Sequence, residues 1–503
     1  MRVVVRFASP RYPAAPMFTL LRFSALSLLA AALCAPLAGQ AQSTVVLTGK
    51  INGKTEDSVA VSVREHPLDA KEQLTYAAVN DKGEFRLALK VDGPTKADLV
   101  YGDDVAGLWL EPGTQLDVRF KGEDLAQTVK FKGKGAEANT YLADFDERFV
   151  ENDGFQVLPD NITFYEAPFL HFLDYRRKEE EKFLKDVQED QAVSPAFRNY
   201  VKAEVAYSYA NDRLTFQDLR EQVVSTENRL KMSDSYYAFL NDAALINNES
   251  ALQNDSYQEF LINYVHYAAT AAGHKKGDPE FYQVCYNLAK EKLQGPARAI
   301  VLGRVLQESF RFGHVRQSAA MLDDFRSTVD KGNKFYPVLK ADFDAHKDFA
   351  IGSPAPDFKL VSAAGDTVSL QSFRGKLVYL NFWRTTSGLS LRDLPYAQEL
   401  AKKFNGQNIA FVNIALDENE PAWKQLVVSK KLAGTHLRAV GGQRGPLAKA
   451  YMLQEVPAYF LIAEDGTFLN TKPKRLSSRA AVDEIKESFG KASTYSSTLP
   501  MGK

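Results

Sequence analysis

At residues 377–390 the chain has the sequence LVYLNFWRTTSGLS, which joins an apolar run to a polar turn. The run from Leu377 to Trp383 is broken by a single polar residue, Asn381, and this pattern predicts a strand that is buried on both faces. Polar residues then end the strand, and Ser387 lies where a serine can cap the start of a helix. We therefore predict a strand, a short connection and a helix at this point of the chain.

The same alternation of strand and helix continues on both sides of this stretch. Further strands are expected at 409–416, 436–440 and 458–462, and helices at 421–431 and 479–489. A hairpin around Gly365 comes before them, and the turn Asp465-Gly466 follows the last of these strands. This order predicts βαβ units closed by a hairpin, in an α/β domain over residues 349–492.

Four short motifs in this region resemble the TlpA/ResA-type thioredoxin-like family, within the thioredoxin and thiol-specific-antioxidant superfamily. They are Gly352-x-x-Ala355-Pro356-Asp357-Phe358, Asn381-Phe382-Trp383, Val456-Pro457 and Phe460-Leu461-Ile462-x-x-Asp465-Gly466. The resemblance implies a thioredoxin-like fold over residues 349–492, a cis peptide bond before Pro457 and thiol–disulfide oxidoreductase activity. It also implies that the two regions before residue 349 are extensions of the kind that exported members carry.

The chain departs from the family pattern at the active-site helix. The family has a Trp-Cys-x-x-Cys segment there, and a match without gaps places Thr386, Ser387, Gly388, Leu389 and Ser390 on it. Serine therefore replaces both active-site cysteines. Thiol–disulfide exchange requires one thiolate to attack a disulfide and a second thiol to resolve the mixed disulfide. We predict that this site has no catalytic residue and that Ser387 caps the helix.

Serine hydrolase chemistry is also disfavoured at this site. A serine becomes a nucleophile only beside an oriented base. His436 is the one histidine within residues 349–492, and the predicted third strand holds it apart from the two serines. The neighbouring Arg384 and Arg392 are cations and cannot act as that base.

Two hypotheses of function remain, and enzymatic activity separates them. In the first, the protein is a redox-inactive module that binds a peptide or protein partner in the cell envelope. Its partner would bind either at the former active site or on the β and helical regions. The predicted binding residues at the former active site are Trp383, Thr386, Ser387, Gly388, Leu389, Ser390, Val456 and Pro457. The alternative for Pro457 is that its turn serves folding alone. In the second hypothesis, which the resemblance implies, the protein is a thiol–disulfide oxidoreductase; this requires either a sequence error at Ser387 and Ser390 or a mechanism that uses Cys285. Envelope glycan binding is a third possibility without a localised signature.

The N-terminus has the pattern of an export signal. Phe18 to Ala38 is a nearly unbroken apolar run with Arg22 near its start, and Gly39 and Ala41 are small residues that suit a cut after Ala41. We predict a cleaved signal peptide over residues 1–41 and a periplasmic or cell-envelope protein. A transmembrane anchor is the alternative. The rest of the chain has no apolar run long enough to span a bilayer, so none is expected after cleavage.

Residues 42–134 form a predicted all-β domain. Short runs rich in β-branched and aromatic residues are separated by turn signals such as Asn52-Gly53 and Pro112-Gly113, which predicts a small sandwich or an open barrel. The runs lie at 45–51, 59–65, 74–79, 84–91, 108–110, 115–120 and 128–131. His66, beside Pro67, is interpreted as an ordinary surface histidine.

Residues 135–348 form a predicted α-helical domain. The pairs Ser194-Pro195, Asp278-Pro279 and Gly295-Pro296 each begin a stretch with the apolar spacing of a helix. We predict helices of about 12–20 residues with short connections, as in a bundle. Residues 178–185 are interpreted as a solvated helix face with charge pairs. Residues 493–503 are predicted to be a flexible tail.

The cysteines and histidines give no cofactor site. The chain has two cysteines, Cys34 and Cys285, which are too few for a disulfide framework or a cysteine-based zinc site. Cleavage after Ala41 leaves Cys285 alone, on an apolar helix face where burial makes a thiol inert. No metal-ligand spacing joins His171, His266, His274 and His314, so we predict no metal and no cofactor.

Composition limits the class of partner. The 503 residues are 45% hydrophobic and 25% charged, with a formal net charge of −1, as in an ordinary globular chain of about three domains. Residues 1–41 contain four arginines and no acid, so cleavage leaves 58 basic and 63 acidic residues. A mildly acidic chain is a poor binder of nucleic acid, and we predict no nucleic-acid partner.

Overall fold

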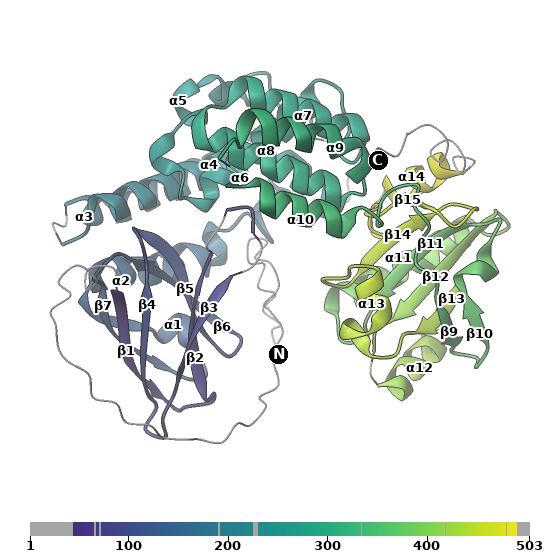
Figure 1. Ribbon diagram of the computed structural model, residues 1–503, viewed down its shortest axis with the longest axis horizontal. Helices are drawn as coiled ribbons and strands as arrows, with labels where there is room; N and C mark the ends of the chain where they lie inside the picture. The colour runs from purple at the N-terminus through teal and green to yellow at the C-terminus, as the bar shows by residue number, and fades with distance from the viewer. Residues whose placement is uncertain are drawn as a thin grey trace. The chain divides into compact units, whose positions relative to one another are not determined.

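The computed structural model describes residues 44–489 except 65–66, 70–71, 190–191, 225–229, 333, 418 and 479. The chain forms two compact units (Figure 1), one within residues 44–276 and 284–304 and the other within residues 277–283 and 305–489. The predicted signal peptide, the predicted tail, Cys34 and His66 lie outside the described residues. The three domain boundaries drawn from the sequence stay a prediction.

The first unit begins with two four-stranded sheets, in the orders β4-β1-β7-β8 and β3-β2-β5-β6. Alternate residues of both sheets, including Leu47, Val61, Leu99 and Val118, point into one shared apolar core. The N-terminal region is therefore rich in sheet, as expected. The strands are β1 (Thr44–Asn52), β2 (Ser58–Val63), β3 (Gln73–Ala78), β4 (Glu84–Lys90), β5 (Thr95–Tyr101), β6 (Asp104–Leu110), β7 (Gln115–Lys121) and β8 (Lys130–Lys134).

Two details of the strand prediction were wrong. Strand β5 is missing from it, although Lys96 and Asp98 alternate there with the core residues Ala97 and Leu99 in the period of a half-buried strand. The predicted strand at 128–131 begins too early, because Leu125–Thr128 forms the short helix α1. The Asp124 side chain caps that helix by accepting the Gln127 N–H, and strand β8 follows.

The middle of the chain is helical, as predicted. The Ser194 Oγ accepts the Phe197 N–H at 3.1 Å, so the predicted cap at Ser194-Pro195 is confirmed. Helices α3 and α4 have 24 and 29 residues, longer than predicted, because no proline or glycine interrupts either one after its first turn. The main helices are α2 (Ala136–Phe145), α3 (Glu166–Glu189), α4 (Pro195–Val223), α5 (Ala243–Ile246), α6 (Asp255–Ala271), α7 (Pro279–Lys292), α8 (Gly295–Arg311), α9 (Val315–Asp324) and α10 (Tyr336–His346).

A buried asparagine on α2 closes the edge of strand β6. The Asn139 Oδ1 accepts the Trp109 N–H at 2.9 Å, and its Nδ2 donates to the Trp109 carbonyl at 2.9 Å. The side chain thus supplies hydrogen bonds of the kind that a neighbouring strand would make. The Trp109 ring in turn packs on Phe197 and Tyr200 of α4, with ring centroids 5.5 and 4.8 Å apart. The outer face of this sheet at β6 is therefore covered by helix α4 of the same unit.

We expect Asn139→Ala to destabilise the first unit by about 2–4 kcal/mol, because it strands a buried backbone donor and acceptor. Asn139 is 0% exposed, so water cannot replace these bonds without opening the packing. Urea denaturation followed by circular dichroism measures the effect. Thr140→Ala, at an exposed position of the same helix, is the control and should change stability by less than about 0.5 kcal/mol. Equal effects of the two substitutions would contradict the prediction.

The second unit contains a seven-stranded sheet in the order β10-β9-β13-β12-β11-β14-β15. Strand β11 lies between β12, to which it is parallel, and β14, to which it is antiparallel. These elements match the α/β order predicted for residues 349–492. They are β9 (Lys359–Ser362), β10 (Thr367–Ser369), β11 (Leu377–Trp383), α11 (Gly388–Lys403), β12 (Ile409–Ala415), α12 (Glu420–Ser429), β13 (Thr435–Arg438), α13 (Pro446–Ala450), β14 (Ala458–Ile462), β15 (Phe468–Asn470) and α14 (Ala480–Ser488).

Both faces of this sheet are covered. On one face Leu400 of α11, Trp423 of α12 and Ile485 of α14 enter apolar clusters with side chains of the sheet. On the other face Ala448 of α13 and Phe358 pack against the alternate residues of the same strands. All seven residues of β11 are buried as a result. This fixes the direction in which the chain leaves the sheet after Trp383.

Candidate functional site

The candidate site lies at the carboxyl end of β11, where the parallel strands β11, β12 and β13 end at one edge of the sheet. Ligands of α/β sheets bind at such an edge. Residues 384–387 connect β11 to α11 there. The segment with Val456 and Pro457 precedes β14 and reaches the same edge, because β14 is antiparallel to β11 and pairs Ala458 with Phe382.

Ser387 is the N-cap of α11, as predicted. Its Oγ accepts the Ser390 N–H at 3.2 Å and donates to the Val456 carbonyl at 3.3 Å. The Val456-Pro457 peptide bond is cis, as the resemblance implied. The hydroxyl of Ser387 thus has a donor on one side and an acceptor on the other, and it joins the helix to the proline segment.

Ser390 is buried beneath this connection, with 2% of its surface exposed. Its Oγ accepts the Arg384 N–H at 3.5 Å. Trp383 is buried as well, whereas Thr386 and Gly388 are exposed and Leu389, Val456 and Pro457 are half-buried. Trp383 and Ser390 therefore lie under the surface that the other predicted site residues form. The role of all eight residues in binding stays a prediction.

A buried carboxylate fixes the connection from below. Asp417, which follows β12, is 3% exposed. Its carboxylate accepts the Thr385 N–H at 3.0 Å and the Thr385 hydroxyl at 2.6 Å. Neither residue was among the predicted site residues. The sequence signal that could have identified Asp417 is its position directly after a buried parallel strand, because ligands of such sheets bind at the carboxyl ends of the strands.

His436 lies on β13 and points to the face of the sheet that carries α11 and α12. Its Nε2 donates to the Ala433 carbonyl at 3.0 Å, and its ring centroid is 6.5 Å from that of Trp383. The Ser387 hydroxyl bonds to the Ser390 N–H and the Val456 carbonyl rather than to His436. Burial lowers the pKa of His436, and the bond to Ala433 offsets part of that change. The histidine is no base for Ser387, because its ring makes no hydrogen bond with that hydroxyl.

Cys285 lies in the first unit, on α7. It is 0% exposed, and its Sγ donates to the Val265 carbonyl at 3.8 Å. A thiol that is buried among apolar side chains has a low fraction of thiolate and little access to a substrate. The interpretation of Cys285 as a core residue agrees with this burial.

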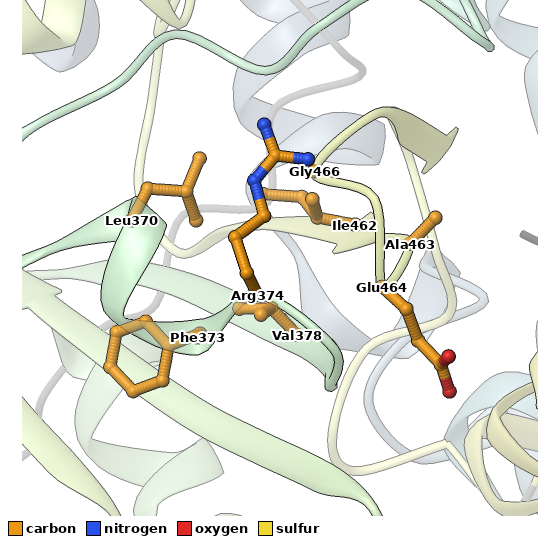
Figure 2. Close-up of a pocket in the computed structure, with 8 residues that line it drawn as sticks. All are labelled: Leu370, Phe373, Arg374, Val378, Ile462, Ala463, Glu464 and Gly466. Atoms are coloured by element: carbon orange, nitrogen blue, oxygen red, sulfur yellow. The ribbon is translucent and has the colours of Figure 1, made fainter.

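Figure 2 shows a shallow pocket at the opposite end of the second unit's sheet. Arg374 lies there over Gly466, whose φ of +79° suits the glycine of the predicted Asp465-Gly466 turn. A Cβ on Gly466 would come within 2.7 Å of the Arg374 Cζ. The pocket is lined by Leu370, Phe373, Arg374, Val378, Ile462, Ala463, Glu464 and Gly466. It contains none of the predicted site residues.

Within the ranges that the structure describes, no three histidine, cysteine or acidic side chains gather as metal ligands. Among the same residues, no helix has both the length and the apolar character needed to cross a membrane.

Comparison with known proteins gives consistent matches to the second unit. The Redoxin family model matches residues 350–485. Thiol-disulfide oxidoreductase ResA of Bacillus cereus (strain ATCC 10987 / NRS 248) is 31% identical over 131 residues, which cover 26% of this chain and 74% of the relative. ResA of Bacillus subtilis (strain 168) is 28% identical over 131 residues, or 26% of this chain and 72% of the relative. A solution structure of a putative thiol-disulfide oxidoreductase from Bacteroides vulgatus is 31% identical and covers 26% of this chain and 86% of its own, with a TM-score of 0.25.

We expect Asp417→Ala to destabilise the second unit by about 2–4 kcal/mol, because the Thr385 N–H and hydroxyl lose their buried acceptor. Urea denaturation followed by tryptophan fluorescence measures this change, since Trp383 and Trp423 lie in this unit. Glu399→Ala, at an exposed position of α11, is the matched loss of a carboxylate. A loss of stability in the control as large as that of Asp417→Ala would contradict the prediction.

His436 should make the second unit less stable in acid. Its pKa is below the ordinary 6.5 in the folded chain, so the unfolded chain binds a proton that the folded chain excludes. This contribution is fully present above pH 6.5 and is lost as the pH falls through the folded-state pKa. We expect His436→Gln to flatten the fall in unfolding free energy below pH 6.5. Burial also lowers the pKa of His314, but the natural chain and the His436→Gln variant both contain that residue. An equal dependence of unfolding free energy on pH in the two proteins would therefore exclude His436 as the cause.

Proposed function

This chain belongs, through residues 350–485, to the thioredoxin-like family of thiol–disulfide oxidoreductases, and from that premise we propose that it is an exported, redox-inactive member. In this proposal the thioredoxin-like part binds a peptide or protein partner in the cell envelope. Catalysis by thiol–disulfide exchange has been replaced by binding alone.

The absence of any cysteine in residues 350–485 carries the proposal. Exchange needs an attacking thiolate and a resolving thiol. A helix N-terminus can bring the pKa of a cysteine into the working range, but a serine hydroxyl starts far too high for that. The two hydroxyls at the start of α11 are instead engaged in holding the Val456 carbonyl and the Arg384 N–H.

The surface at this edge supports a binding role. Thr386 and Gly388 are exposed, and half-buried Leu389 and Pro457 add apolar area beside them. The N-terminus of α11 carries a partial positive charge, and the exposed Arg392 increases it. An extended peptide segment with an apolar side chain and an acidic group has the complementary chemistry.

Thiol–disulfide oxidoreductase activity is the second candidate, because the matching relatives bear that name. In this chain it would have to use Cys285, the one cysteine that remains after the predicted cleavage. A single thiol can form a mixed disulfide but cannot resolve it. Glycan binding by the β sheets stays a prediction without a supporting contact.

Reduction of insulin by dithiothreitol tests the loss of redox activity. We expect the natural chain to leave the rate at background and the Ser387→Cys/Ser390→Cys variant to raise it several-fold, because the helix start then carries two thiols. Cys285→Ala is the control. A natural chain that reduces insulin above background, and loses this activity in Cys285→Ala, would overturn the proposal.

Site-specific photo-crosslinking tests the binding role. We expect a crosslinker placed at exposed Thr386 to give discrete protein adducts in intact cells, because this position lies on the proposed binding surface. The same crosslinker at Glu399, also exposed on α11, is the control. Adducts of equal yield at both positions, or none at Thr386, would count against binding at this edge.

A further inference from the structure

The sheet β4-β1-β7-β8 has an outer face that is strongly basic. Strands in this sheet alternate, so residues next to Leu47, Phe85, Val118 and Phe131 of the core point outward. The outward and exposed cations are Lys50, Arg86, Lys90, Arg119, Lys121, Lys130, Lys132 and Lys134. We call these eight residues the basic sheet face.

The pairing register brings these cations together. Lys50 lies opposite Arg119, and Arg119 lies opposite Lys130 on the next strand. Adjacent strands are about 4.8 Å apart and alternate residues about 7 Å apart. Neighbouring cations of β1, β7 and β8 therefore lie within the Debye length of about 8 Å at physiological salt, whereas Arg86 and Lys90 of β4 pair with Thr48 and Thr44.

Few carboxylates oppose this charge. Glu84 and Asp117 are the acidic residues at outward positions of the four strands. Asp117 is already paired with Arg119 at 3.0 Å, and Glu84 accepts from the Asn80 amide at 3.1 Å. Eight cations thus face two carboxylates in a chain whose formal net charge is −1. The excess is local to this face.

The outer face of the other sheet in this unit is less exposed than the basic sheet face. The outward residues Ala60 and Ser62 of β2 and Trp109 of β6 are buried, whereas Tyr76 of β3 is 64% exposed. Trp109 packs on α4, as described above. One sheet therefore uses its outer face to contact helices of its own unit, while the basic sheet face has no such cover among the described residues.

We propose that the basic sheet face docks on the surface of an anionic lipid bilayer. A plane of cations spread over four strands matches a plane of phosphate headgroups, whereas a linear polyanion fits a groove or a single line of charge. Basic residues near an anionic leaflet add to binding one by one. The outward positions of these strands carry no aromatic side chain on which a base or a sugar could stack.

The test is flotation of the chain from Gln42 to Lys503, which contains every described residue, with lipid vesicles. One set is phosphatidylcholine alone, and the other contains about 30% phosphatidylglycerol. We expect binding to the anionic set alone and a fall in affinity of about tenfold or more between about 50 and 300 mM NaCl. Binding of equal strength to both sets, or none to the anionic set at low salt, would overturn the proposal.

Charge variants locate the binding to this face. Lys50→Gln/Arg86→Gln/Lys130→Gln/Lys132→Gln should weaken binding by about tenfold or more, and Lys50→Arg/Lys130→Arg/Lys132→Arg should keep it. Lys402→Gln/Lys403→Gln/Lys430→Gln/Lys449→Gln removes the same charge from exposed positions of the second unit and should cost less than about twofold.

Two further results would contradict the assignment. One is an equal loss of vesicle binding in both four-residue glutamine variants, which would make net charge rather than this face the cause. The other is binding to polyglutamate or duplex DNA without binding to the anionic vesicles, which would give the face a linear polymer as its partner. Circular dichroism of each variant confirms that it is folded, and none of these residues belongs to the site at α11.

Discussion

The complete burial of β11 is the constraint on which the thioredoxin-like part depends. A strand that is buried on both faces must be apolar along its length and must be covered by helices on each side. Leu377 to Trp383 satisfy the first condition, and α11, α12 and α14 on one face with α13 on the other satisfy the second. Once this strand is fixed, the chain can leave it only at the edge where β12 and β13 also end. The connection to α11 is therefore a consequence of the core.

The apolar core of this part lies between the sheet and its helices, whereas the candidate site lies at the edge of the sheet. The fold can therefore persist without thiols at that edge. The position of Ser387 requires a side chain that accepts a backbone N–H, and a serine meets that requirement as an N-cap. Its hydroxyl also reaches the Val456 carbonyl, while Asp417 holds Thr385 from the adjacent strand. Local structure at this edge of the sheet is thus supported by hydrogen bonds that involve no sulfur.

The two sheets of the first unit differ in what their outer faces contact. One face places Trp109 against α4 and uses Asn139 to close the edge strand β6. The other carries eight exposed lysine and arginine side chains at outward positions. Both begin from the same alternation of residues, in which every second side chain enters the shared core. The difference lies in the residues between: Ala60, Ser62 and Trp109 are buried at outward positions of one sheet, and eight cations are exposed at outward positions of the other.

Much of this organisation was determined by the sequence alone, because it rests on local periodicity and turn chemistry. The apolar run from Leu377 to Trp383, the alternation in Glu84 to Leu89 and the Ser194-Pro195 cap are signals of that kind, and each gave an element in the expected place. Strand β5 was missed although Lys96 and Asp98 alternate there with the core residues Ala97 and Leu99. What only the tertiary structure decided depends on residues far apart in the chain: the partner of Thr385 is Asp417, the partner of Ser387 is Val456, and the cations of β1, β4, β7 and β8 become neighbours through pairing. Register and the packing of distant segments set these contacts, and a one-dimensional pattern does not contain them.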